Sequence, residues 1–307
     1  MQEGTEMRLK EKTRTKLKEA GFIVSMLILP VTGFLVFWLG VNFNSILLAF
    51  QKPIYGKPSV WSLENFSMLF KEFVDKDSVI LQALKNTLIF FSVSLFVMIP
   101  LSLLMSFFLY KKIRFYRFFR YVFFLPSVIS ATVLTAVFSR IVGPNGVVSA
   151  VYEWLFHKDM PLLLATNRYA LKTIVAYCIW TGFGVNVVLF SSAMMRVPSE
   201  VIEAGKLDGV STFREFVSII VPLIWPTIST VVTLAIVNVF SSSGPILLFT
   251  KGDHGTYTIA YWIFEQVYEN NTYEYSAAVG LFFTIVGVPI VFIVRKVSEK
   301  LGEAIEY

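Results

Sequence analysis

Six long apolar stretches dominate this 307-residue chain and restrict what it can fold into. They lie at residues 22–50, 84–110, 121–142, 170–194, 224–248 and 275–294. A helix rises about 1.5 Å per residue, so each stretch can cross about 30 Å of hydrocarbon. Hydrophobic residues make up 55% of the chain and charged residues only 16%, which excludes an ordinary soluble globular protein. The pattern predicts an all-α polytopic membrane protein with six transmembrane helices.

The distribution of basic residues predicts the orientation of these helices. The N-terminal tail (1–20), the second connection, the loop between the fourth and fifth spans, and the C-terminal tail (296–307, with Arg295) carry 17 Lys and Arg, and the alternate connections carry 7. By the positive-inside rule, we expect both termini in the cytoplasm, with a membrane domain over 21–295 between the tails. The first apolar run is too long for a signal-peptide core. The net charge of +6 fits this topology rather than nucleic-acid binding.

Four prolines lie in or beside the predicted spans, namely Pro100, Pro126, Pro226 and Pro289. Neighbouring helices and local adjustments can satisfy the backbone groups that a membrane proline frees. We therefore expect kinks at these positions rather than breaks.

The longest polar interruption in the C-terminal half is residues 197–222, VPSEVIEAGKLDGVSTFREFVSIIVP. Ser199 is placed to cap a first helix, and Gly209 favours a sharp turn that ends it. Thr212 and Glu215 have the spacing of a capping box, which predicts a second helix. Helical periodicity groups a set of small residues on one face of the first helix, where another surface can approach closely: Val201, Ala204 and Gly205.

This stretch resembles the cytoplasmic EAA loop of binding-protein-dependent ABC importer permeases. The chain matches the fixed offsets of the family pattern at Glu203, Ala204, Gly209, Ile219 and Pro222. Gly205 stands in place of the second Ala and Val221 in place of Leu, so both departures keep small or aliphatic character. Shorter family-like pieces at 61–66, 85–87, 123–126, 179–180 and 244–245 extend the resemblance over nearly the whole chain. They are most similar to the MalF/UgpA-like carbohydrate branch.

The resemblance implies a type I ABC importer permease fold, in which six transmembrane helices carry a cytoplasmic EAA coupling-helix loop. It implies that the first helix of the loop inserts into a groove on a separate ATPase subunit. The residues to which we carry this coupling role are Glu203, Ala204, Gly205, Asp208, Gly209 and Pro222. For Glu203, a purely electrostatic role at the helix start is the alternative.

The resemblance also implies partners and a location. The expected partners are a second homologous permease subunit, for which a heterodimer is favoured, two ATPase subunits, and an extracytoplasmic solute-binding protein. Mg-ATP would be bound by the ATPase subunits, and no cofactor by this chain. The expected location is the lipid bilayer of a bacterial cytoplasmic membrane.

Charged residues are placed in a way that argues against an energy source within the chain. No Asp or Glu lies within an assigned span, and Lys85, Arg140 and Lys172 lie close to span ends. A proton- or ion-coupled carrier would ordinarily use charged groups at depth in the membrane. The chain also lacks a Gly-x-x-x-x-Gly-Lys-Ser/Thr phosphate-binding motif. We expect a transport subunit rather than an enzyme, with ATP hydrolysis on a partner.

Polar side chains within the fourth and fifth spans are the candidates for substrate contact: Trp180, Asn186, Asn238, Ser241, Ser242 and Ser243. Amides and hydroxyls hydrogen-bond sugar hydroxyls, and aromatic faces stack on sugar C–H surfaces. Asn and Ser also join membrane helices, so helix packing is the alternative for each. The single cysteine, Cys178, and the two separated histidines indicate no metal site.

The sequence therefore predicts a permease subunit that translocates a carbohydrate, preferably an oligosaccharide. An importer of another solute, such as a peptide or phosphate, is an alternative, and so is a self-sufficient secondary transporter. A membrane-bound enzyme is a third class, for which Asp75 and Asp77 are the nearest carboxylate pair, without a partner motif.

Overall fold

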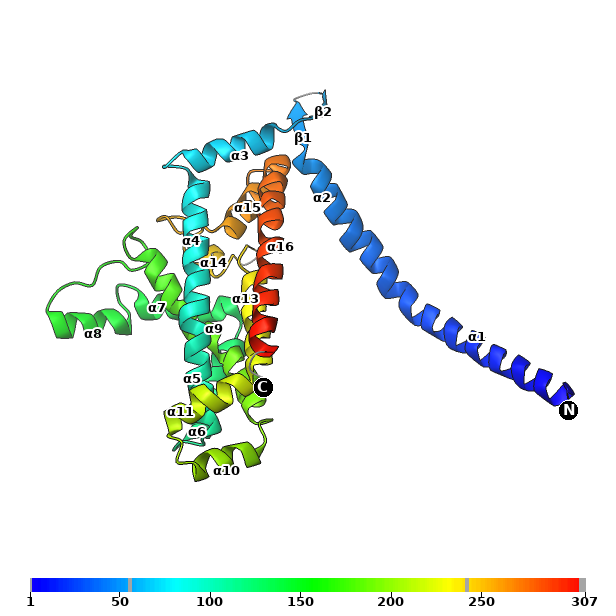
Figure 1. Cartoon of the computed structure of the whole chain (residues 1–307). Helices are drawn as coiled ribbons and strands as arrows, with labels where there is room; N and C mark the ends of the chain where they lie inside the picture. The colour runs from blue at the N-terminus through cyan, green and yellow to red at the C-terminus, as the bar shows by residue number, and fades with distance from the viewer. Residues whose placement is uncertain (1, 55–56, 241–242, 304–307) are drawn as a thin grey trace. The chain divides into compact units, whose positions relative to one another are not determined.

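The chain is mostly helical in the computed structural model, which describes residues 2–54, 57–240 and 243–303 (Figure 1). Contacts divide it into two compact units. The first unit contains the chain up to Phe66 together with Tyr273–Leu281. The second contains Ser67–Thr272 and the chain from Phe282 onward, and it holds both of the candidate sites described below.

The first unit begins with three helical segments in direct succession and a short hairpin. The helical segments are α1 (Gln2–Gly33), the π-helical η1 (Phe34–Gly40) and α2 (Val41–Ala49). The hairpin, which the sequence did not predict, pairs β1 (Gln51–Ile54) with β2 (Lys57–Trp61) in antiparallel fashion. The buried amide of Asn65 donates to the carbonyls of Ala49 at 3.1 Å and Gln51 at 2.9 Å. These bonds fix the start of α3 (Glu64–Val74) against the helix-to-hairpin junction.

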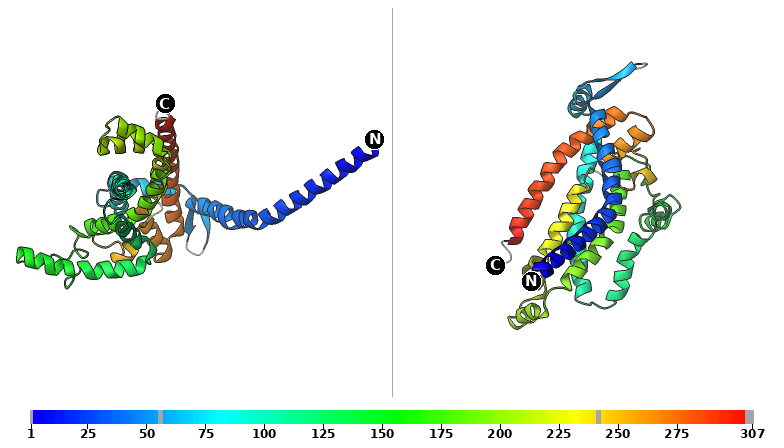
Figure 2. Two further views of the ribbon diagram at one scale, coloured as in Figure 1. Left: turned by 90° about the horizontal axis from the view of Figure 1, so that it is seen from below. Right: turned by 90° about the vertical axis from the view of Figure 1, so that its right-hand side faces the viewer.

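Three helices lie side by side in the second unit (Figure 2). One is a continuous rod made of α4 (Val79–Val93), the π-helical η2 (Ser94–Met98) and α5 (Ile99–Tyr110). The others are α9 (Ala170–Met194) and α13 (Trp225–Val237).

Two buried serines join the rod to α9. The Oγ of Ser102 lies 3.4 Å from the carbonyl oxygen of Phe183, and that of Ser106 lies 3.0 Å from the carbonyl oxygen of Val187. Small hydroxyl residues let two helix backbones approach closely and supply hydrogen bonds between them. The rod and α9 are therefore held in a defined register.

The third predicted span, 121–142, is not one continuous helix. It is divided between α6 (Tyr116–Val128) and α7 (Ala131–Val142), which α8 (Val147–Phe156) follows. Ile129 and Ser130 between them are extended, with ψ of 141° and 135°. Pro126 lacks the N–H for the preceding turn, and α6 ends two residues later. The prediction that Pro126 would only kink this span was wrong, since the helix breaks there.

The fifth predicted span, 224–248, also differs from the prediction. Its helix, α13, ends at Val237, with Asn238 as the C-cap. Gly244, with a φ of +56°, and Pro245 lie further along and precede the next short helix. At its other end, the helical segment Thr212–Leu223 meets α13 at an angle of 73° beside Pro226. The remaining helices are α14 (Ile246–Phe249), α15 (Ile259–Tyr268) and α16 (Tyr273–Glu303), which contains Pro289.

Pro100 is accommodated without a break. Before it, the N–H of Ile99 bonds to the carbonyl of Ser94, five residues back, which is the π-helical pattern. Proline cannot donate and its ring crowds the preceding turn, so a widened turn ahead of it relieves both problems.

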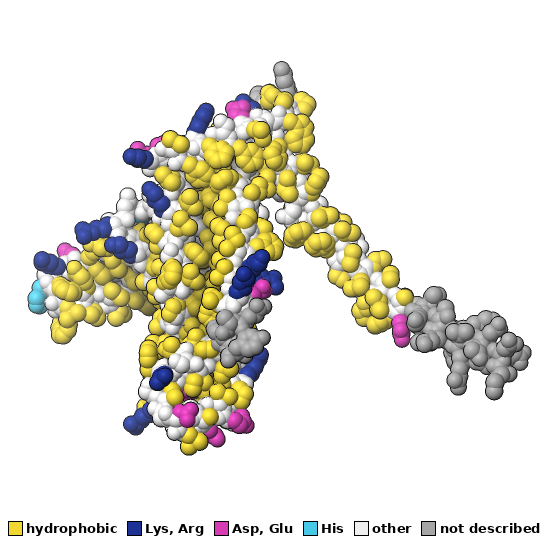
Figure 3. All heavy atoms as spheres, in the orientation of Figure 1, with side chains coloured by type: hydrophobic (Ala, Val, Ile, Leu, Met, Phe, Trp, Pro, Cys, Tyr) yellow, Lys and Arg dark blue, Asp and Glu magenta, His cyan; other side chains and the backbone are white. Residues whose placement is uncertain are grey.

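Length and composition of the helices agree with a membrane protein of several spans. Within the described residues, five helices are long and apolar enough to cross a membrane, and a sixth is added if the bent pair around Ile224 is one span. In the second unit, apolar side chains cover the flank of the α4–α5 rod (Figure 3). Phe96 on that rod is 72% exposed, as a lipid-facing side chain would be. These observations support the predicted class of all-α polytopic membrane protein.

Candidate functional site

The EAA-like loop, residues 197–222, folds as two short helices joined by a tight turn. It contains α10 (Ser199–Leu207), α11 (Thr212–Glu215) and the π-helical η3 (Phe216–Ile220), which leads into α12 (Val221–Leu223). In Figure 1, α10 and α11 lie at the end of the second unit where α5 ends. Charged side chains gather at this end in Figure 3.

Gly209 forms the turn that the sequence predicts. Its φ is +72°, the left-handed conformation that favours glycine. The N–H of Val210 bonds to the carbonyl of Gly205 at 3.0 Å, and the N–H of Gly209 to that of Lys206 at 3.1 Å. This pair of bonds is a Schellman motif, and it satisfies carbonyls that the end of α10 would otherwise leave unpaired.

Both predicted helix caps lie one residue away from the observed ones. Pro198, not Ser199, occupies the N-cap position of α10, so Ser199 is the first helical residue. Ser211 caps α11, since its Oγ accepts from the N–H of Arg214 at 3.4 Å. Thr212 is therefore inside the helix. Glu215, which was assigned to the capping box, is instead buried against another segment.

The inner face of α10 consists of Ile202 and Gly205, which are both buried. Ile202 belongs to the same apolar cluster as Phe190 and Ile220. A Cβ on Gly205 would lie only 2.8 Å from Cδ1 of Ile219. Of the predicted face, Val201 and Ala204 are exposed but Gly205 is buried, so the surface that Gly205 lets approach belongs to its own chain. Two positions of the motif, 205 and 219, thus lie against each other.

The outer face of α10 is exposed and mixes acidic and apolar side chains. Glu203, Ala204 and Asp208 are exposed, as is the turn at Gly209. Leu207 is 90% exposed, and Phe213 just after the turn is 74% exposed. Large apolar side chains on an otherwise polar end indicate a surface that another molecule covers. Pro222 is half-buried inside the chain and follows η3, so it shapes the exit from the loop rather than this surface.

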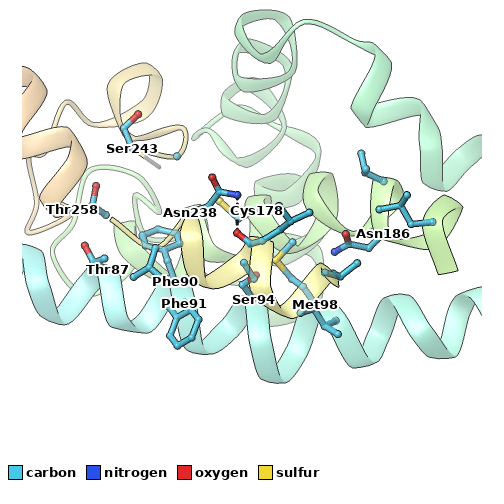
Figure 4. Close-up of a pocket in the computed structure, with 18 residues that line it drawn as sticks. Thr87, Phe90, Phe91, Ser94, Met98, Cys178, Asn186, Asn238, Ser243 and Thr258 are labelled. Carbon is cyan, nitrogen blue, oxygen red and sulfur yellow. Dashed lines mark hydrogen bonds between the residues drawn. The ribbon is translucent and has the colours of Figure 1, made fainter. Parts of the chain in front are cut away.

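A second feature is a cavity of about 410 Å³ between the α4–α5 rod, α9 and the end of α13 (Figure 4). Asn186 and Asn238 both line it, and so does Ser243. Asn186 is half-buried on α9, and Asn238 ends α13, where its amide donates to the carbonyl of Leu234 at 2.9 Å. The structure thus brings three of the predicted substrate-pathway residues together.

The other predicted pathway residues do not join them. Trp180 is not among the lining residues, and its ring stacks on Phe138 with centroids 6.1 Å apart. Cys178 does line the cavity. Successive residues of a helix are about 100° apart, so Trp180 faces nearly away from Cys178. Ser241 and Ser242 lie outside the described residues.

Sequence reasoning missed the wall that the rod contributes. This wall consists of side chains on one face of α4, η2 and the start of α5: Thr87, Phe90, Phe91, Ser94, Met98 and Ile99. Figure 4 shows Ser94 and Met98 on the rod between Asn238 and Asn186. Thr87 and Ser94 are seven residues apart, which is two helical turns, so a polar stripe on an apolar span was the available signal.

Two buried polar residues of α4 hold the end of the cavity near Thr258. The amide of Asn86 donates to the carbonyls of Gly255 and Tyr257, both at 2.8 Å. The hydroxyl of Thr87 accepts from the N–H of Ile259 at 3.1 Å. These bonds explain why an Asn-Thr pair stands at this point of the second predicted span.

The chemistry available in the cavity is recognition rather than reaction. The 18 described residues that line it are uncharged, and they combine two amides, hydroxyls and phenylalanine rings. Among the described residues, no cluster of three or more His, Cys, Asp or Glu side chains is arranged to hold a metal ion. An uncharged, partly aromatic lining suits a ligand with hydroxyl groups and C–H faces.

Relatives of known description are similar to this chain in sequence. At 28% identity over 277 residues, the chain is similar to the arabinooligosaccharides transport system permease protein AraP of Bacillus subtilis, covering 89% of this chain and 85% of the relative. It is also 28% identical over 207 residues to the multiple sugar-binding transport system permease protein MsmF of Streptococcus mutans, covering 66% and 70%.

A solved structure matches the fold over nearly its whole length. It belongs to a bacterial ABC transporter involved in the import of the acidic polysaccharide alginate. The match has a TM-score of 0.82 and 20% identity, and it covers 94% of this chain and 99% of the other. The predicted ABC importer permease fold is therefore confirmed.

The family described as "binding-protein-dependent transport system inner membrane component" matches residues 84–302. This range includes the cavity, the EAA-like loop and the rod from residue 84 onward. Since it covers well over half of the chain, the protein belongs to the family of inner membrane components of binding-protein-dependent transport systems.

Proposed function

We propose that this chain is the permease subunit of an ATP-driven importer that translocates a carbohydrate, preferably an oligosaccharide. The cavity that unites Asn186, Asn238 and Ser243 with the aromatic face of α4 is the observation that carries the proposal. The names of relatives such as AraP and MsmF, which refer to oligosaccharide and sugar transport, support a saccharide as cargo.

The proposed partners follow from the exposed surface of the EAA-like loop and from a related transporter complex. The exposed surface of α10 and the turn, with Glu203, Ala204 and Asp208, would insert into an ATPase subunit that binds Mg-ATP. A second, homologous permease would supply the other half of the pathway, and a second ATPase would complete the pair. A periplasmic-type binding protein would deliver the sugar, as the complex of a related transporter with an alginate pentasaccharide-bound periplasmic protein suggests.

The proposed orientation places both termini and the EAA-like loop in the cytoplasm. The excess of Lys and Arg on that side, 17 against 7, supports it. Within the same class, an importer of a non-sugar solute is the second candidate, since the coupling loop specifies the machine and not its cargo.

Mild-detergent affinity purification from native membranes, followed by mass spectrometry, tests the proposed assembly. We expect recovery of an ATPase and a second permease, and ATP-dependent uptake of the sugar bound by the associated binding protein. Recovery of the chain alone, with transport that needs no nucleotide, would contradict the proposal and favour a secondary transporter.

Substitution tests the cavity. Asn186→Leu replaces the amide in the lining with an apolar side chain of similar size. We expect the apparent affinity for the sugar to fall by about 2- to 10-fold, which corresponds to the loss of one hydrogen bond. Thr181→Val is the matched control on α9, because Thr181 is outside the lining and bonds to the carbonyl of Tyr177. Equal effects of the two substitutions would count against the cavity as the sugar site.

A further inference from the structure

A buried ion pair joins the EAA-like loop to the end of α5. The Nζ of Lys111 lies 2.6 Å from both carboxylate oxygens of Glu215. Lys111 caps the C-terminus of α5, and Glu215 is the last residue of α11, 104 positions later in the chain. We propose that this pair is the linkage that carries movement of the loop to the cavity wall, an inference that rests on the proposed function.

Burial distinguishes this pair from the other two ion pairs of the described residues. Glu215 is 4% exposed, and the Lys111 side chain is 26% exposed. The side chains of Lys52–Glu64 and Arg295–Glu299 are each at least 46% exposed. Exposed pairs contribute little to stability, whereas a buried carboxylate that loses its partner is strongly unfavourable. The loop and the end of α5 are therefore expected to move together.

Two aromatic rings pack beside the pair and restrict the movement of its side chains. The rings of Phe107 and Phe216 lie 4.8 Å apart. Phe216 directly follows Glu215, and Phe107 is about one helical turn before Lys111. Lys111 lies over the Phe107 ring at 5.6 Å. Phe107 and Ile202 belong to one buried cluster, so the contact continues from the ion pair to the inner face of α10.

The loop reaches two walls of the cavity by different routes. Along the chain, η3 and α12 lead into α13, whose Val231 and Leu234 line the cavity. The other wall belongs to the rod, whose Ser94 and Met98 line the cavity while its far end carries Lys111. The first route is covalent, and the second runs through contacts between the loop and the rod, of which Lys111–Glu215 is the ion pair. The pair is thus a positioning contact: through it, the rod wall of the cavity moves when the loop moves, as the α13 wall does through the chain.

The single cysteine of the chain offers a direct readout, because Cys178 lines the cavity. We would tag the full chain in its native host and prepare inside-out membrane vesicles that keep its partners. The rate at which N-ethylmaleimide modifies Cys178 is then measured without nucleotide and with Mg-ATP plus vanadate. For the wild type, we expect the rate to change by about 5-fold or more, the lower range of coupling between distant sites.

Lys111→Met and Glu215→Gln should each abolish the nucleotide response while the rate without nucleotide stays at the wild-type value. The exchanged pair, Lys111→Glu with Glu215→Lys, should restore the response. An apolar double variant, Lys111→Met with Glu215→Leu, keeps the site filled and should insert normally without responding. Glu299→Gln breaks an exposed pair on α16 and is the matched control, with a wild-type response expected.

Two outcomes separate the inference from the function on which it rests. A wild-type response in Glu215→Gln or in the apolar double variant would overturn the linkage and leave the importer function standing. If Mg-ATP plus vanadate does not change the rate of Cys178 modification in the wild type, the proposed function is overturned, and the linkage with it.

Discussion

The turn at Gly209 allows a prediction whose size follows from the structure. Its φ of +72° is costly for any residue with a Cβ, by about 1–2 kcal/mol for an L-residue in the left-handed region. A Cβ built at Gly209 would have no heavy atom of the described residues within 4 Å. The cost of Gly209→Ala is therefore conformational, and it should lower the population of this turn by about 5- to 30-fold.

The identity of the substituted residue sets the rank order. Asn tolerates the left-handed region better than other non-glycine residues, and β-branched Val tolerates it worst. ATP-dependent uptake should therefore decrease from the wild type through Gly209→Asn and Gly209→Ala to Gly209→Val. Thermal unfolding of the purified chain should be affected by no more than this conformational cost of about 1–2 kcal/mol, because a Cβ at position 209 would contact no described atom.

Uptake in vesicles and co-purification of the ATPase provide the assay, and the two should fall in parallel. Gly33→Ala is the matched control, since a Cβ there would also have no described atom within 4 Å but the φ is an ordinary −57°. If Gly209→Val transported as well as Gly209→Asn, the reasoning from backbone conformation would be refuted.

Two further predictions concern packing and pH. A Cβ at Gly184 would overlap the backbone carbonyl of Phe123, so Gly184→Ala should separate α9 from α6. We expect it to destabilise the chain by about 1–3 kcal/mol, measured by thermal unfolding in detergent. An unchanged unfolding temperature would contradict this packing. The hydroxyl of Tyr257 donates to Glu265 Oε1 at 3.0 Å, and burial together with that carboxylate raises the pKa of Tyr257. Because its folded pKa exceeds the ordinary value of about 10, its contribution to stability should be constant below pH 10 and decline above it. Tyr257→Phe should remove that part of the alkaline decline, which a pH series of unfolding curves would detect.

Local sequence signals determined much of this protein. The apolar stretches are long enough to require membrane helices, and the second and fourth of them correspond to the rod and to α9. Gly209 is a turn because glycine enters the left-handed region without penalty. The motif spacing identified the family, since a pattern of fixed offsets survives in one short segment whatever surrounds it.

The residues of the EAA-like loop and of the cavity show that local signals do not determine which face of a helix turns inward. Helical periodicity placed Gly205 beside Val201 and Ala204, yet the face that turns inward is set by contact with Ile219. Likewise, Trp180 and Asn186 are equally plausible polar positions on one span, and only packing against α4 and α13 decides that Asn186 lines the cavity. Propensity describes one segment at a time, whereas orientation depends on neighbours.

Glu215 shows the difference most clearly. From the sequence alone it has the spacing of a capping residue and would be solvated at a helix start. The tertiary structure buries it and brings Lys111 to its carboxylate from 104 residues away. The sequence by itself determined the second and fourth spans, the turn and the family, because these depend on neighbouring residues. Only the tertiary structure decided the cavity and the ion pair, because each joins segments whose contact no local pattern encodes.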